Sequence, residues 1–268
     1  MSKAITRTTT PAPRLLIALA MLALAFLLLP LIGLLLETPW AQLPALLTST
    51  TATEALRLSI VTSLLAAAVA TILGVPLAWV LARKKFTGQR FVRGIVLLPL
   101  VLPPVVGGVT LLTAFGRRGL VGQYLYDWFG IQLPFSTAGV VMAEAFVAMP
   151  FLVITVEGAL RSIDTRYEQA ARTLGASPRT VLFRITLPMI SASLLAGIVL
   201  AWARALGEFG ATITFAGNFP GVTQTLPLAV YSALEVSRDE AIALSLVLLA
   251  VSLTVLVSLR GRFLGSRS

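Results

Sequence analysis

The chain has 268 residues, of which 57% are hydrophobic and 12% are charged, and its mean hydropathy is +0.92. Soluble domains carry roughly 25% charged residues, so a chain this apolar must be surrounded largely by lipid. Cysteine and histidine are absent, which excludes disulfides, thiolate catalysis and the commonest metal ligands of proteins.

ATP binding by a P-loop is also excluded. The sequence contains no GxxxxGK[ST] pattern, and its lysines are Lys3, Lys84 and Lys85. The formal net charge of +10 raises the question of nucleic-acid binding. The basic residues flank apolar runs rather than forming a separate domain, so we expect no nucleic-acid partner.

A helix needs about 20 apolar residues to cross the hydrocarbon core. Six such stretches follow one another, at residues 15–36, 58–82, 94–116, 137–156, 185–203 and 241–259. The first is too long for a signal-peptide core and lacks a clear cleavage site, which predicts an uncleaved anchor. A further uncharged run, 211–234, is rich in Gly, Asn and Pro, and we expect a loop there with a short re-entrant or surface helix.

The positive-inside rule places both termini in the cytoplasm, because 16 of the 21 basic residues then lie on the inner side. Four segments follow: a cytoplasmic N-terminal tail (1–14), a first span with its outer loop (15–54), a membrane core (55–260) and a cytoplasmic tail (261–268).

The third apolar stretch contains residues that break helices. Pro99, Pro103 and Pro104 each lack a backbone donor, and Gly107 and Gly108 loosen the helix further. A broken helix at membrane depth is tolerated where it lines a cavity or packs on protein. We interpret Pro103, Pro104 and Gly107 as candidates for a translocation pathway; the alternative is a kinked, inert span.

A polar, helix-forming segment lies between the fourth and fifth stretches, and we call it the island; its central part is residues 168–188. Asp164 predicts the start of a helix at Thr165, Gly175 its end, and Ser177 with Pro178 the start of a second helix. Its apolar face consists of Ile163, Tyr167, Ala170, Ala171 and Leu174. Val181, Leu182 and Ile185 are expected to continue into the fifth span, with Pro188 in its first turns. The residues alone fit two interpretations, a surface that docks on a partner protein and an amphipathic connector that rests on lipid.

The island resembles the EAA motif of ABC-importer permeases, EAA-x3-G-x9-I-x-L-P. The residues at the motif's spacing are Ala170, Ala171, Gly175, Ile185, Leu187 and Pro188, whereas Gln169 replaces the motif's Glu and the acid, Glu168, sits one residue earlier. This resemblance implies that the island is a coupling helix, seated in a groove of a cytoplasmic ATPase subunit.

The outer end of the fifth stretch, ARALGEFGATITFAGNFPG (203–221), contains Arg204 and Glu208 at the i,i+4 spacing of a helical ion pair. Together with the third stretch it resembles oxyanion-importer permeases, the sulfate and molybdate group, and most closely the molybdate members. A pathway for a dianion needs weak, successive contacts rather than a buried arginine cluster. Neutral donors that fit by position are Thr110, Thr113, Thr212, Thr214 and Asn218.

Glu144 is the lone acid within a predicted span. A structural pairing with Arg204 or another helix is one interpretation. A proton relay, which would make the chain an ion-coupled secondary transporter, is the other. An intramembrane enzyme would need a nucleophile, an acid–base pair or a metal site, and without Cys or His only Glu144 and scattered Ser or Thr remain for it. A scaffold could keep the six spans but would not need broken helices.

The sequence as a whole predicts an all-α polytopic protein with six transmembrane helices, the type I ABC-importer permease fold and a cytoplasmic coupling helix. The resemblance implies a homodimer, two cytoplasmic ABC ATPase subunits and an extracytoplasmic molybdate-binding protein in a bacterial or archaeal cytoplasmic membrane. We expect a transport subunit that is not an enzyme and binds no cofactor, with ATP and Mg²⁺ held by the ATPase. Sulfate or thiosulfate and tungstate remain alternative cargoes.

Overall fold

The computed structural model describes residues 13–263, with side chains described through Thr254. The described chain is all-α, as predicted. Its elements are α1 (Arg14–Leu36), α2 (Leu43–Leu47), α3 (Thr50–Arg83), α4 (Gln89–Val101), α5 (Pro104–Phe115), α6 (Gly122–Phe129), α7 (Thr137–Ser162), α8 (Arg166–Thr173), α9 (Pro178–Val181), the π-helix η1 (Leu182–Thr186), α10 (Leu187–Met189), α11 (Ser191–Leu206), α12 (Gly210–Ala216), α13 (Leu226–Val236) and α14 (Arg238–Phe263). Residues 1–12 and 264–268 of the two predicted tails lie outside the described residues.

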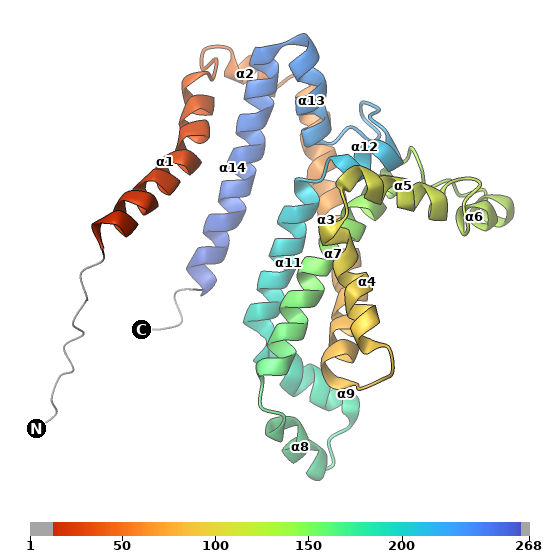
Figure 1. Ribbon diagram of the computed structural model, residues 1–268. Helices are drawn as coiled ribbons and strands as arrows, with labels where there is room; N and C mark the ends of the chain where they lie inside the picture. The colour runs from red at the N-terminus through yellow and green to blue at the C-terminus, as the bar shows by residue number, and fades with distance from the viewer. Residues whose placement is uncertain (1–12, 264–268) are drawn as a thin grey trace, which may run out of the picture.

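Three long helices, α3, α7 and α11, form the centre of the molecule (Figure 1). Their shared core is rich in alanine, and Ala70, Ala148 and Ala201 are fully buried. Small residues let membrane helices approach closely, because packing replaces the hydrophobic driving force that lipid removes. Leu152 of α7 fits against Gly74 of α3 and Gly197 of α11, where an added Cβ would lie 3.0 and 3.1 Å from it.

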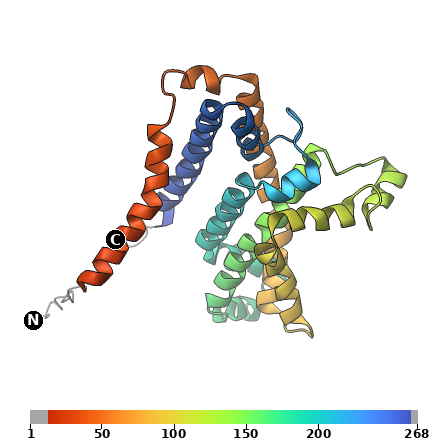
Figure 2. The same cartoon turned by 45° about the horizontal axis from the view of Figure 1, so that its top comes forward.

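Two further groups of helices pack at one end of this bundle. α13 and α14 lie against the first part of α3, and α5 and α12 lie against the first half of α7. α8 and α9 lie at the opposite end (Figure 1). α1 stands apart from the bundle in both views, and none of its residues is buried (Figures 1 and 2).

The third predicted span is not one straight helix. α4 ends at Val101, and Leu102 and Pro103 adopt extended backbone with ψ near 135° and 133°. α5 then runs across the end of the bundle toward α6 instead of continuing along α4 (Figures 1 and 2). Consecutive prolines at 103 and 104 explain the break, because the residue before a proline avoids helical backbone.

The predicted fifth span, which follows Arg184, is not one straight helix. The segment Pro178–Met189 is bent by 75° from α11, which begins at Ser191. Ile185, Leu187 and Pro188 therefore lie on the island's side of the bend. Pro188 lacks the N–H that would bond back to the preceding turn, and the π-helix directly before it shows that the regular ladder is already interrupted.

Among the described residues, three helices are long and apolar enough to cross a membrane: α1, α3 and α7. The bent segment with α11 makes a fourth if it counts as one span. The run 211–234 contains two short helices, α12 and α13, so no continuous span forms there, as predicted. The full count of six spans stays a prediction.

Candidate functional site

The island between α7 and α11 folds nearly as its residues predict. The first helix, α8, begins at Arg166, one residue later than expected, and the Asp164 carboxylate accepts from the Arg166 N–H at 2.9 Å. Gly175 ends it with φ +85°, and the N–H of Ala176 reaches back to the carbonyl of Ala171 at 3.0 Å. This is a Schellman turn, in which glycine takes the left-handed position at least cost.

The second helix of the island starts where the sequence places it. The Ser177 hydroxyl accepts from the Thr180 N–H at 3.2 Å, and Pro178 occupies the first helical position. Both features satisfy or remove donors that a helix start leaves unpaired. The two short helices therefore meet at a sharp turn at the end of the bundle (Figure 1).

Glu168 anchors the island to the bundle. Its Oε1 accepts from Arg83 Nη2 at 2.8 Å and from the Thr186 hydroxyl at 2.9 Å, and the residue is buried. The acid thus ties α8 to the end of α3 and to the π-helix. Sequence reasoning missed this role, because Arg83 lies 85 positions away; a basic residue at the end of a predicted span was the available signal.

The opposite face of α8 points to solvent. Tyr167 is 60% exposed and Leu174 88% exposed, and Gln169 and Ala170 are exposed beside them. Ala171 is half-buried. The predicted apolar face therefore splits: Ile163 packs against the core, while Tyr167, Ala170 and Leu174 form an uncovered apolar surface with small residues between two larger ones.

The end of the motif is also divided between core and surface. Leu187 packs against the central core, Ile185 is half-buried, and Pro188 is exposed. These three residues position the turn into α11 rather than extend the surface of α8.

The third apolar stretch (94–116) and the segment 203–221 lie against each other. An added Cβ at Gly210 of α12 would lie 2.5 Å from Pro104 Cβ, and one at Gly108 of α5 would lie 2.5 Å from Thr214 Cβ. Glycine is required at such positions, because any side chain would force the two helices apart. The broken third span and the segment after α11 thus form one unit.

This unit borders a small cavity of about 150 Å³ at the break between α4 and α5. Its lining residues include Pro104, Gly107, Phe146 and Arg204, whereas Pro103 caps α5 outside it. Arg204 forms an ion pair with Glu208, whose other oxygen accepts from the Ala211 N–H at 2.8 Å. Glu208 is buried and so both neutralises the arginine and holds the first turn of α12.

The predicted neutral donors are mostly occupied within their own helices. The hydroxyls of Thr110, Thr113 and Thr214 donate to backbone carbonyls at 2.7 to 2.8 Å. Thr212 is fully buried with no hydrogen-bond partner for its hydroxyl, and Asn218 donates to Ser232 at 2.8 Å. The unpartnered atoms among these side chains are the Thr212 hydroxyl and Asn218 Oδ1, and the second of these is an acceptor.

One interpretation of Glu144 was an ion pair with Arg204. The structure does not form that pair, because Arg204 is bound to Glu208. It is buried in α7, where its Oε1 accepts from the Thr62 hydroxyl of α3 at 3.0 Å and its Oε2 has no partner. The contact joins two helices of the central bundle.

Comparison with known proteins identifies the family. Residues 70–267 match the model of the "Binding-protein-dependent transport system inner membrane component". The chain belongs to this permease family.

Permeases of known type align with this chain over three quarters of its length or more. The "Molybdenum transport system permease protein ModB" of Mycobacterium tuberculosis is 47% identical over 94% of this chain and 96% of its own length. The protein of the same name from Escherichia coli K12 is 45% identical over 76% and 89%. The "Sulfate transport system permease protein CysT" of Salmonella typhimurium is 35% identical over 87% and 85%.

Solved structures show that the fold is shared at low sequence identity. A bacterial ABC transporter that imports alginate matches with a TM-score of 0.75 at 19% identity, covering 95% of this permease and 96% of that chain. The same kind of transporter in complex with an alginate pentasaccharide-bound periplasmic protein matches with a TM-score of 0.74 at 20% identity, over 94% of each chain. The permease therefore has the type I ABC-importer fold that the sequence predicted, in a multi-pass membrane protein of the transport class.

Proposed function

We propose that this chain is the membrane-spanning subunit of an ATP-driven importer whose cargo is molybdate. The observation that carries the cargo is the 47% identity to a molybdenum permease over 94% of the chain, which exceeds the 35% identity to a sulfate permease over 87%. Both cargoes are tetrahedral dianions, so general charge and size do not separate them. The second candidate is therefore sulfate or thiosulfate, and tungstate is the third.

The assembly supplies what the chain lacks. Two cytoplasmic ATPase subunits hold ATP and Mg²⁺, and an extracytoplasmic oxyanion-binding protein delivers the cargo. The exposed surface of Tyr167, Ala170 and Leu174 is suited to the ATPase, because small residues between larger apolar ones let a groove approach the backbone. Glu168, Gln169, Ala171 and Gly175 complete this coupling surface, and Ile185, Leu187 and Pro188 orient it.

Coupling follows from the rigidity of the contact between the island and the bundle. A push on α8 is transmitted through Glu168 to Arg83 at the end of α3 and to Thr186 before the bend into α11. Rigid elements that pack in two alternative arrangements carry such motion between distant sites. ATP binding by the partner thereby alternates the pathway between inward-facing and outward-facing states.

A pathway of two halves requires a second copy of the permease, related by a twofold axis. The exposed, apolar α1 supports this, because it buries no residue against its own chain. Within each copy we assign the pathway to the helix break, where Pro104, Gly107 and Arg204 line one cavity, with Pro103 and Thr212 as further candidates.

Competition for uptake tests the cargo. The permease, its ATPase and its binding protein are reconstituted in vesicles, and labelled molybdate uptake is measured against unlabelled molybdate, tungstate and sulfate. Molybdate is expected to compete best and sulfate least. Preferential competition by sulfate would assign the chain to the second candidate. Uptake that follows a proton gradient without ATP hydrolysis would instead favour the carrier model based on Glu144.

A further inference from the structure

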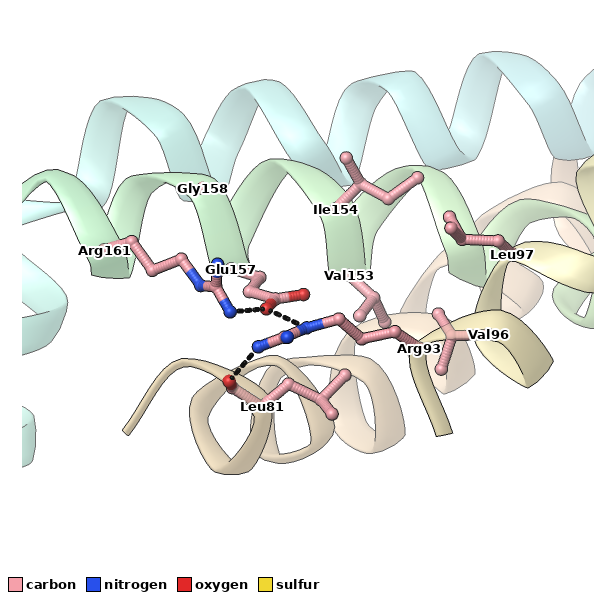
Figure 3. A pocket seen from close by; sticks show the side chains of 9 residues that line it. All are labelled: Leu81, Arg93, Val96, Leu97, Val153, Ile154, Glu157, Gly158 and Arg161. Atoms are coloured by element: carbon pink, nitrogen blue, oxygen red, sulfur yellow. Dashed lines mark hydrogen bonds and ion pairs between the residues drawn. The ribbon is translucent and has the colours of Figure 1, made fainter. Parts of the chain in front are cut away.

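One acid and two arginines tie three helix ends together at the α8 end of the bundle. Glu157 Oε1 accepts from Arg93 Nε and from Arg161 Nη2, both at 2.8 Å (Figure 3). Arg93 also donates to the carbonyl of Leu81 at 2.8 Å. The contacts clamp the end of α3, the start of α4 and the end of α7.

This trio carries a surplus positive charge. One carboxylate faces two guanidinium groups, and Glu157 is the single acid among the described residues that line the adjoining pocket. A guanidinium has five N–H donors, of which these contacts take two from Arg93 and one from Arg161. Donors and charge therefore remain for an anion, and the Arg161 side chain is 50% exposed, so an anion can reach it.

The pocket beside the trio is amphipathic along the axis of α7. It has a volume of about 320 Å³ and is lined beyond the arginines by apolar side chains, including Val96 and Val153 (Figure 3). Val153 precedes Arg161 by two helical turns, about 12 Å along α7. Charged side chains thus lie at the helix ends, and apolar side chains line the part of the pocket that extends toward the middle of α4 and α7.

We propose that this pocket binds an anionic phospholipid, with the headgroup phosphate at Arg93 and Arg161 and the start of an acyl chain along Val96 and Val153. A free oxyanion shares the phosphate chemistry but makes no use of the apolar lining. Basic pockets between membrane helices at the cytoplasmic surface are suited to anionic headgroups. The proposal requires that the helices span a membrane and is independent of the cargo.

Lipid binding to the purified full chain tests the site. The protein in detergent is titrated with phosphatidylglycerol or with phosphatidylcholine of the same acyl chains, and bound lipid is counted by native mass spectrometry. We expect phosphatidylglycerol to bind at least about fivefold more tightly, and Arg161→Gln to remove about that factor, since one basic residue contributes about this much at a membrane surface.

Two further variants make the sign of the effect decisive. Glu157→Gln raises the surplus charge and should strengthen phosphatidylglycerol binding, whereas Arg161→Gln weakens it. Arg166→Gln is the matched control, because that side chain lies at the same end and is 89% exposed outside the pocket. Its lipid binding should equal that of the unaltered chain. If Glu157→Gln does not fold, the comparison of Arg161→Gln with Arg166→Gln still decides.

Three outcomes would overturn the proposal. Equal binding of the two lipids would show that charge is not recognised. Displacement of the lipid by inorganic phosphate or molybdate at equal concentration would assign the pocket to a free oxyanion. Absence of bound lipid in all variants would mean that another surface, such as a second copy, fills the pocket.

Discussion

At the scale of single residues, two buried acids at opposite ends of the molecule each hold an arginine. Glu168 faces inward to Arg83 and Thr186, so the acid that precedes the motif supports the island instead of forming its exposed surface. Glu208 plays a similar part at the other end, holding both Arg204 and the start of α12. The remaining question is whether Arg204 also contacts the cargo.

A double substitution answers this question. Arg204→Gln alone leaves the buried Glu208 carboxylate unpaired and should cost about 3 kcal/mol of stability. Adding Glu208→Gln removes that penalty, so the double variant should regain a melting temperature near that of the unaltered permease. If the guanidinium contacts the oxyanion, uptake should stay low in the double variant.

The measurements are thermal unfolding in detergent and labelled uptake after reconstitution. Recovery of uptake together with stability would show that the pair is purely structural.

At the scale of elements, two helix pairs depend on glycine for different reasons. Gly175 has positive φ with open space around it, so its role is conformational. Gly108 lies where α5 and α12 touch, so its role is steric. The first pair belongs to the coupling surface and the second to the helix break.

Gly175→Asp should leave the permease inserted but uncouple uptake from ATP hydrolysis, because it places a carboxylate where we propose that the turn meets the ATPase. Gly88→Asp is a matched control, since Gly88 has φ +86° and equally open surroundings in the loop before α4. Both changes carry a backbone strain of about 1–2 kcal/mol. Only the change at 175 should lower uptake; normal uptake in both variants would sink the docking model.

Neighbouring glycines provide a second test. An added Cβ at Gly108 would lie 2.5 Å from Thr214 Cβ and 2.8 Å from the Ala211 carbonyl, whereas one at Gly107 would lie an ordinary 3.5 Å from Phe146. Gly108→Ala should therefore destabilise the permease by about 1–3 kcal/mol through overpacking, and Gly107→Ala should be tolerated. Thermal unfolding of the two variants checks this; equal melting temperatures would contradict the observed packing.

At the scale of the whole molecule, the helix ends separate into two sides. The start of α1 and the end of α14 point toward the side on which α8 lies, and α2 and α13 lie at the other end (Figure 1). The positive-inside rule makes the α8 side cytoplasmic. The placement of the termini and the orientation of the spans stay predictions.

Because the chain has no cysteine, single introduced thiols report orientation directly. Asp127→Cys on α6 and Thr173→Cys on α8 are both at exposed positions. A membrane-impermeant maleimide should label the first in intact cells and the second in inverted membrane vesicles. The reverse pattern would place the island outside and exclude contact with a cytoplasmic ATPase.

The sequence by itself determined that lipid surrounds the chain, that the fold is helical, and how the island turns. Gly175, Ser177 and Pro178 act on groups within five residues of themselves, so their positions fix the turn without reference to the rest of the fold. The motif spacing added the transporter family, which comparison then confirmed. These inferences succeeded because local hydrogen bonding and transfer from water depend on nearby residues alone.

Only the tertiary structure decided how the segments meet. The bond between Glu168 and Arg83, the contact between α5 and α12, and the turn of α5 away from α4 depend on helix packing across many residues. Apolar runs of similar length look alike in sequence, whether they cross a membrane straight, bend by 75° or break at a proline pair. Packing chooses among these, because it sets which backbone groups find partners inside the protein.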